Sequence, residues 1–173
     1  GRNGAAAQFQ DSSRVLTVQK STSTPPMVHA TVAAWVKGSG TILSRANDLD
    51  LVFSNTGIQI RAVKTSGSTP VTITRTLNIP VAQQPNPATW NHIVATFSGV
   101  EGGIYVNSVF QPYAQIHLYV NGQEVAADLN GPVGQLLASN NNWQIGSAGS
   151  GAGFVGSLDD VRLYRTVLTS SEV

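Results

Sequence analysis

Residues 143–173 read WQIGSAGSGAGFVGSLDDVRLYRTVLTSSEV, and this stretch decides the fold. Trp143 and Ile145 alternate with a polar residue before a glycine, which predicts a short half-buried strand. A loop of glycine, serine and alanine follows, and residues 158–164 then interleave apolar and charged side chains as a second strand. Thr169 with Glu172 three residues later forms a capping box, which predicts a helical turn at the end.

Two other stretches have strand character and lead to a family resemblance. Residues 90–97 read WNHIVATF, and residues 118–122 read LYVNG, a strand that ends in an Asn-Gly turn. The three stretches together resemble laminin-G-like, concanavalin A-like jelly-roll domains. The last strand of that family runs Phe-x-Gly-x-hydrophobic-Asp-Asp/Glu-Val-Arg-hydrophobic-Tyr, and residues 154–164 are similar to it. The resemblance implies an all-β, two-sheet antiparallel β-sandwich, with residues 1–173 as one domain of a larger protein.

The rest of the chain independently favours a β-sandwich. Strand-like runs with turn residues between them cover residues 4–9, 14–18, 28–37, 41–45, 49–54, 57–64 and 71–77. Both alternating faces of residues 28–37 are mostly apolar, which predicts a central strand that is covered on both sides. Three prolines mark residues 80–88 as an irregular connection. Many short strands without helical periodicity are typical of two packed antiparallel sheets.

Composition excludes several classes of function. Charged residues make up 11% of the chain and the net charge is +1, so neither nucleic acid nor an anionic membrane surface is expected as partner. The chain has no cysteine, which excludes a disulfide scaffold and a cysteine-ligated zinc site. No apolar run approaches the roughly 20 residues of a membrane helix. We expect an extracellular protein, secreted or on the cell surface of a bacterium.

Catalytic constellations are missing from the sequence, and we expect that the protein is not an enzyme. The three histidines, His29, His92 and His117, all fall within predicted strands. Glycoside hydrolases of the same fold often carry Glu-x-Asp-x-Glu, whose period of two places three carboxylates on one strand face. This chain has no such run, and consecutive Asp159 and Asp160 are expected on opposite faces of their strand.

The family resemblance implies a possible structural Ca²⁺ site. Relatives hold calcium with the first aspartate of the final strand and with groups near the end of the first strand. Asp159 matches the first position and Asp11 lies close to the second, one residue after Gln10, where an aspartate is common in relatives. Carboxylate oxygens suit this hard cation. The alternative is that Asp159 only accepts hydrogen bonds from backbone amides.

Aromatic residues divide between core and ligand roles. Family core positions hold Phe9, Trp35, Trp90, Phe97 and Phe154. Sugars stack on exposed aromatic faces while polar side chains bind their hydroxyls. On that basis the predicted ligand-binding residues are Tyr105, Tyr113, Trp143, Asp48 and Arg45.

An insertion at residues 98–115 separates two strands that a short turn joins in relatives. It is either an added β-hairpin, with residues 104–106 paired to residues 109–110 across Asn107 and Ser108, or a loop beside the ligand. Long connections are often functional, so we expect Tyr105 and Tyr113 to contribute to recognition. The alternative is that the insertion packs against the fold and has no role in recognition.

The predicted function is a non-catalytic recognition module, most simply a carbohydrate-binding or adhesin domain. Its partners would be a glycan or cell-surface ligand and other domains of the same chain. One alternative is a structural or protein-binding module that binds no sugar. A third is an accessory domain of a glycan-active enzyme.

Overall fold

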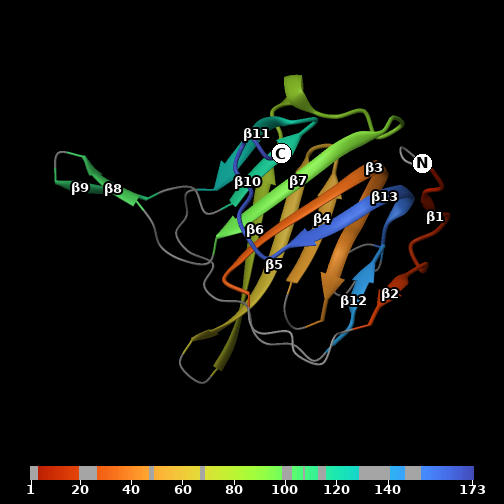
Figure 1. Ribbon diagram of the computed structural model, residues 1–173, viewed down its shortest axis with the longest axis horizontal. Helices are drawn as coiled ribbons and strands as arrows, with labels where there is room; N and C mark the ends of the chain where they lie inside the picture. Colours follow the sequence, from red (N-terminus) through yellow and green to blue (C-terminus); the bar gives the residue numbers. More distant parts are fainter. Residues whose placement is uncertain are drawn as a thin grey trace.

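The computed structural model describes residues 4–19, 27–46, 49–66, 69–98, 103–106, 108–112, 116–128, 141–146 and 153–173 (Figure 1). Within them, antiparallel strands dominate, and the predicted all-β fold is confirmed. The strands are β1 (Ala7–Phe9), β2 (Leu16–Val18), β3 (His29–Arg45), β4 (Leu49–Ser54), β5 (Gly57–Ser66), β6 (Thr69–Asn78), β7 (Asn91–Ser98), β8 (Gly103–Val106), β9 (Val109–Pro112), β10 (Ile116–Val120), β11 (Gln123–Asp128), β12 (Trp143–Ile145) and β13 (Val155–Tyr164). A short 3-10 helix, Val81–Gln83, lies in the proline-rich connection.

Strand β3 is the element that joins the two layers. Its first half pairs with β7 and β13, and its second half pairs with β4 and β12. The sequence predicts two strands here, but the structure shows one continuous strand that bends. Gly38 and Gly40 permit the bend, because their φ angles of +128° and +121° lie where side chains are rarely tolerated. A Cβ on Gly38 would also lie 2.1 Å from the carbonyl oxygen of Val155.

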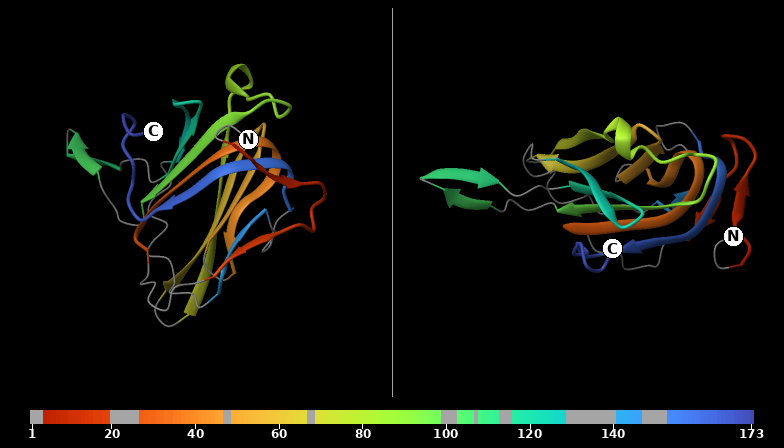
Figure 2. Two further views of the ribbon diagram at one scale, coloured as in Figure 1. Left: turned by 45° about the vertical axis from the view of Figure 1, so that its right-hand side comes forward. Right: turned by 90° about the horizontal axis from the view of Figure 1, so that it is seen from above.

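The strands form two layers that pack face to face (Figure 2). In the first sheet the order is β11-β10-β7-β3-β13-β1, and in the second it is β2-β12-β3-β4-β5-β6. An ion pair links the far ends of the layers, with Nε of Arg75 on β6 3.0 Å from a carboxylate oxygen of Asp128 on β11. The sheets are thus joined by the shared strand β3 on one side and meet at this ion pair on the other.

Apolar side chains from alternate positions of both sheets form the core. The first sheet contributes Val32, Ala34, Val36, Ile93, Ala95, Phe97, Ile116, Leu118 and Leu158, and the second contributes Ile42, Leu49, Leu51, Phe53, Ile58, Ile60 and Ala62. Phe9 and Phe154 are also buried, with their rings edge to face at 5.9 Å. Burial of Phe9, Phe97 and Phe154 agrees with the sequence prediction.

Trp35 and Trp90 lie outside this core, so their predicted core role is wrong. Both are half-buried and belong to neither buried cluster of the described residues. Ala34 and Val36 point into the core, and alternation along a strand therefore directs Trp35 to the outer face of the first sheet.

The insertion forms a separate hairpin, β8-β9, that projects away from the sandwich in Figures 1 and 2. Val106 pairs with Val109 across Asn107 and Ser108, as the hairpin alternative predicted. Ser108 has a φ of 63°, which suits the tight turns of two-residue hairpins.

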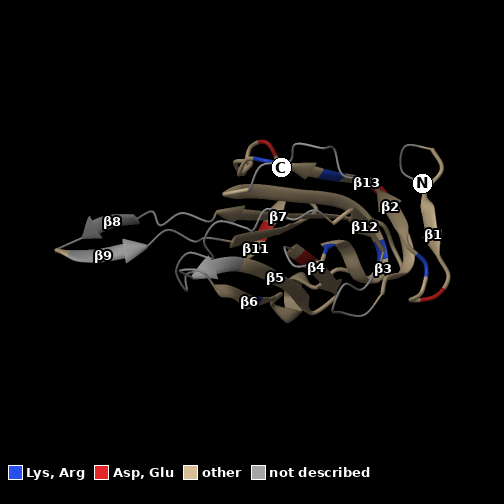
Figure 3. Ribbon diagram, turned by 90° about the horizontal axis from the view of Figure 1, so that it is seen from below, with Lys and Arg blue, Asp and Glu red and all other residues tan. Residues whose placement is uncertain are grey.

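Among the described residues, ribbon segments of Lys and Arg are few and lie on separate elements (Figure 3). In the part of the chain that the structure describes, no helix is long and apolar enough to cross a membrane.

Candidate functional site

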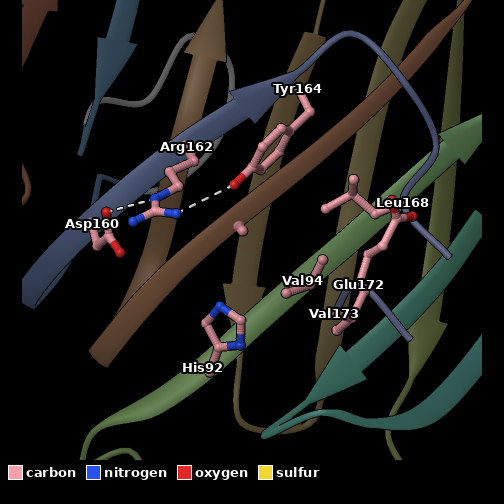
Figure 4. A pocket seen from close by; sticks show the side chains of 9 residues that line it. His92, Val94, Asp160, Arg162, Tyr164, Leu168, Glu172 and Val173 are labelled. Atoms are coloured by element: carbon pink, nitrogen blue, oxygen red, sulfur yellow. Dashed lines mark hydrogen bonds and ion pairs between the residues drawn. The ribbon is translucent and has the colours of Figure 1, made fainter. Parts of the chain in front are cut away.

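A polar cavity of about 220 Å³ lies on the outer face of the first sheet (Figure 4). Strands β3, β7 and β13 form its floor and one wall, and the C-terminal segment after β13 forms the other wall. The lining residues are Ala33, His92, Val94, Asp160, Arg162, Tyr164, Leu168, Glu172 and Val173. We call this site the outer-face cavity.

A β-bulge in β13 shapes the polar side of the cavity. Asp159 pairs with Trp35 and Arg162 pairs with Ala33, so two residues of β13 oppose one residue of β3. Asp160, the extra residue, has a φ of 50°, which is uncommon for a residue other than glycine. Bulges re-aim side chains, and here the bulge directs Asp160 into the outer-face cavity. The expectation that Asp159 and Asp160 lie on opposite faces is therefore wrong, because the bulge interrupts the alternation.

An ion pair fixes the cationic group of the cavity. Nε of Arg162 donates a hydrogen bond of 2.7 Å to Oδ1 of Asp160, and Nη1 lies 3.5 Å from the hydroxyl of Tyr164. The hydrogen bond to Asp160 raises the pKa of the Arg162 guanidinium, so this group stays charged. Asp160 balances the charge while more than half of the Arg162 side chain remains exposed. The guanidinium is thus oriented and still accessible.

Aromatic rings extend the face beside this ion pair. Trp35 and His92 are cross-strand partners on β3 and β7, with ring centroids 5.1 Å apart and planes inclined by 32°. Both residues are half-buried, as is Tyr164 on β13. The outer face therefore combines flat apolar surfaces with a fixed donor and acceptor.

Hydrogen bonds to Thr31 anchor the C-terminal wall. The Thr31 hydroxyl donates to the Thr166 carbonyl at 2.7 Å and accepts from the Leu168 amide at 3.0 Å. Farther on, the Thr169 amide donates to Oε2 of Glu172 at 2.8 Å, which lowers the pKa of that carboxyl group. The predicted capping pair does meet, and the Glu172 amide donates to the Thr169 carbonyl at 3.0 Å, which closes a single turn.

A small apolar cluster supports the cavity floor. Ala33, Val94 and Tyr119 are buried on the outer face, and Tyr164 and Val173 pack against them. Burial raises the pKa of the Tyr119 phenol, and nearby Glu124 raises it further. The floor is therefore a packed surface, separate from the main core.

Two predicted ligand-binding residues meet elsewhere in the fold. The guanidinium of Arg45 on β3 lies 4.2 Å from the ring centroid of Trp143 on β12. Arg45 is only 1% exposed, which makes this contact part of the packing at the edge of the core. Asp48 and Tyr113 lie outside the described residues. Tyr105 lies on β8, and a ligand role for all five residues stays a prediction.

The two predicted calcium ligands lie at opposite ends of the pairing between β1 and β13. A Cβ on Gly153 would meet the carbonyl oxygen of Ser12 at 1.9 Å, so Asp11 lies beside Gly153. Asp159 directly follows Leu158, which pairs with Ala7 at the start of β1.

Both aspartates accept hydrogen bonds from residues next to them in the chain. The hydroxyl and amide of Ser13 donate to Asp11 and lower its pKa, and the Asp160 amide donates to Asp159 at 2.9 Å. Within the described residues, no three histidine, cysteine, aspartate or glutamate side chains gather as metal ligands would. Calcium stays a prediction, and it would need other oxygen ligands at either aspartate.

The sequence analysis missed the residues of the outer-face cavity as a group. Alternation along residues 28–37 placed Trp35 opposite Ala34 and Val36, and that signal could have shown its outward position. No sequence signal shows the bulge at Asp160, because its φ of 50° depends on pairing with β3.

Comparison with known proteins assigns the family. Residues 9–173 match a laminin G-type family model, that of the concanavalin A-like lectin/glucanases superfamily. The chain belongs to this superfamily. No curated protein matched this laminin G-type domain in a sequence search.

Three solved structures share the fold of the laminin G-type domain. Domain 4 of AbnA, a GH43 extracellular arabinanase from Geobacillus stearothermophilus in complex with arabinotriose, is 16% identical with a TM-score of 0.64, covering 99% of this chain and 76% of the other. A heptameric SAP-like pentraxin from Limulus polyphemus is 16% identical with a TM-score of 0.52, covering 90% and 77%. The binding domain of botulinum neurotoxin serotype G is 11% identical with a TM-score of 0.52, covering 96% and 45%.

Proposed function

We propose that this domain is a non-catalytic carbohydrate-binding module and that the outer-face cavity binds the sugar. The observation that carries the proposal is the oriented Arg162–Asp160 pair beside the Trp35–His92 rings on one accessible face. Sugars have apolar C–H faces that stack on aromatic rings, and hydroxyl groups that need both donors and acceptors. The cavity supplies both kinds of surface within neighbouring strands.

Charge balance favours a neutral sugar over an acidic one. The positive charge of Arg162 is matched by Asp160, and Glu172 adds a further carboxylate to the lining. A carboxylate or sulfate on the ligand would be repelled by these groups, whereas hydroxyl groups can bridge them. The arabinotriose complex of the AbnA domain supports a neutral pentose oligomer as the first ligand to test.

A recognition role also implies a location and partners. We propose an extracellular setting, on a bacterial surface or in a secreted protein, where other domains of the same chain act beside this one. Charged residues make up only 11% of the chain, and the similar AbnA domain belongs to an extracellular arabinanase. Both observations support this setting. A glycan-active enzyme with this domain as accessory is compatible with the same binding site.

Calorimetry with matched arginine variants tests the proposal. Neutral arabino-, xylo- and gluco-oligosaccharides are titrated into the wild-type domain, Arg162→Ala and Arg14→Ala. Arg14 is a suitable control because it also faces an aspartate and its side chain is 57% exposed, against 56% for Arg162. We expect Arg162→Ala to weaken binding at least about tenfold, as loss of a charged hydrogen-bond donor does.

Two outcomes would contradict the proposal. If Arg162→Ala and Arg14→Ala bind as well as the wild type, the sugar binds at another site. If none of the neutral oligosaccharides binds to the folded wild-type domain, the alternative of a protein-binding module gains support.

A further inference from the structure

The β8-β9 hairpin is a two-stranded sheet with two open edges. Gly103–Val106 pairs only with Val109–Pro112, and no other described strand joins either side of the hairpin. An isolated two-stranded hairpin is marginally stable in water, and additional strands are needed to stabilise it. In Figure 2 the hairpin projects away from the two layers, and no described strand lies along either of its edges.

The two-residue turn determines which backbone groups face outward. A turn of this kind is closed by a hydrogen bond between Val106 and Val109, and bonded and non-bonded pairs then alternate along the hairpin. The next pair, Tyr105 with Phe110, and the last pair, Gly103 with Pro112, are therefore non-bonded pairs. Their backbone N–H and C=O groups point away from the partner strand.

The two edges differ in their ability to accept another strand. On the β9 edge, Pro112 has no N–H group, and proline blunts an edge in this way. On the β8 edge, Gly103 and Tyr105 each direct an N–H and a C=O outward, and no described strand pairs with them. Residues 103–112 contain no charged side chain, so the usual electrostatic protection of an edge strand is missing.

We propose that a second copy of this chain pairs with the β8 edge through a two-fold axis at Ile104. Antiparallel pairing about this residue places Gly103 opposite Tyr105 of the second copy, and Tyr105 opposite Gly103 of the second copy. Each of these pairs exchanges two backbone hydrogen bonds, so every outward group of β8 between these residues is satisfied. The same surface serves both copies, as a closed dimer requires. Two marginal hairpins become one four-stranded sheet.

The short pairing makes this a weak dimer. Interfaces well below about 1,200 Å² support transient rather than permanent complexes. The fraction of dimer therefore depends on protein concentration. A covalent cross-link detects such a weak dimer better than a measurement of the non-covalent dimer. This inference does not rest on the proposed sugar site, and its test uses no sugar.

Cysteine cross-linking tests the axis, because the chain has no cysteine of its own. In the proposed dimer, Ile104 faces its own copy as a non-bonded pair, with the two Cα atoms about 4.5 Å apart. A disulfide accepts Cα separations of about 4.4–6.8 Å. We expect Ile104→Cys to form a disulfide-linked dimer under mild oxidation. The control is Gln111→Cys, at the position opposite Ile104 on β9, which should remain mostly monomeric.

A pair of proline variants in the Ile104→Cys background tests the edge. Tyr105→Pro removes an outward N–H from β8, and Phe110→Pro removes the matching N–H from β9. Both leave the internal hydrogen bonds of the hairpin intact, so thermal unfolding of the sandwich should not distinguish them. We expect Tyr105→Pro to reduce the cross-linked fraction at least about tenfold and to shift sedimentation towards monomer, whereas Phe110→Pro should not.

The proposal is overturned if both cysteine variants cross-link equally or if neither does. It is also overturned if Tyr105→Pro leaves the dimer of Ile104→Cys unchanged. A wild-type domain that sediments as a monomer at every concentration tested, together with an absent cross-link, would point to a strand of a different protein as the occupant of the β8 edge.

Discussion

The inner and outer faces of the first sheet are made by alternate residues of the same strands, yet their chemistry differs. On β3, Ala34 and Val36 point inward and are 1% exposed, whereas Trp35 between them points outward and is half-buried. On β7, Ile93 is buried in the core while His92 lines the outer-face cavity. The inner face is apolar and closed, whereas the outer face also carries polar and half-buried aromatic side chains around a cavity.

Because of this difference, alternate residues of one strand serve different purposes: the inner ones stability and the outer ones recognition. Inner residues gain free energy by leaving water, and removing them opens enclosed space. Outer residues around the cavity remain accessible, so their polar groups are available to a ligand. Substitutions on adjacent residues should therefore produce different phenotypes, and the predictions below follow from that contrast.

The largest effect is expected on the inner face of β10. Leu118 is fully buried in the core, so Leu118→Ala should lower the free energy of unfolding by about 3 kcal/mol through lost burial and a cavity. Urea denaturation measures this change, and the folded fraction should still bind the sugar normally. Val81→Ala is the control, because Val81 is 85% exposed and the loss should stay below about 0.5 kcal/mol.

A smaller loss of stability is expected for Trp35→Ala. The sequence analysis placed Trp35 in the core, where its removal would cost about 3–5 kcal/mol. Because the side chain lies on an open face, water can fill the space, and we expect a loss of about 1–2 kcal/mol. Sugar affinity should fall in the same variant. If Trp35→Ala loses as much stability as Leu118→Ala and keeps its sugar affinity, the proposed difference between the two faces is wrong.

Stability and binding should change in opposite directions at Asp160. Its φ of 50° is strained for aspartate but easy for glycine, so Asp160→Gly should raise the melting temperature slightly. The same change removes the carboxylate that orients Arg162, and sugar affinity should fall. Scanning calorimetry and titration of one sample measure both quantities. If Asp160→Gly is less stable than the wild type and binds sugar normally, the bulge has a purely structural role.

The smallest effect concerns the pH dependence of the C-terminal wall. The Thr169 amide lowers the pKa of Glu172, which means that the charged carboxylate favours the folded turn. This contribution is present above the unfolded pKa and disappears as the pH falls through the lower folded pKa. The Thr169 amide resonance should shift over that acidic range. In Glu172→Gln, which has no carboxyl group to titrate there, the shift should be absent.

Local pattern was enough to predict much of the fold. The last strand with its Phe154-to-Tyr164 motif, the alternation of the inner face and the turn residues all depend on neighbours in the chain, and each was confirmed by the sheets and the family match. The hairpin was also predictable, because Asn107 and Ser108 separate two β-prone segments.

Pairing between distant strands decided the candidate site. The outward position of Trp35, the bulge at Asp160 and the wall around Thr31 each join segments that are far apart in sequence. Similarly, the register of β1 on β13 places Asp11 and Asp159 at opposite ends of this pairing. A motif carries no information on that register.

The sequence by itself determined the all-β class, most of the strands and the low fraction of charged residues, because these depend on composition and on a period of two along each strand. Only the tertiary structure decided which face of β3 is enclosed, which side chains share the outer-face cavity and that no described strand joins either edge of the β8-β9 hairpin. These features depend on register, on bulges and on whether another layer covers a face, and all three are set by residues distant in the chain.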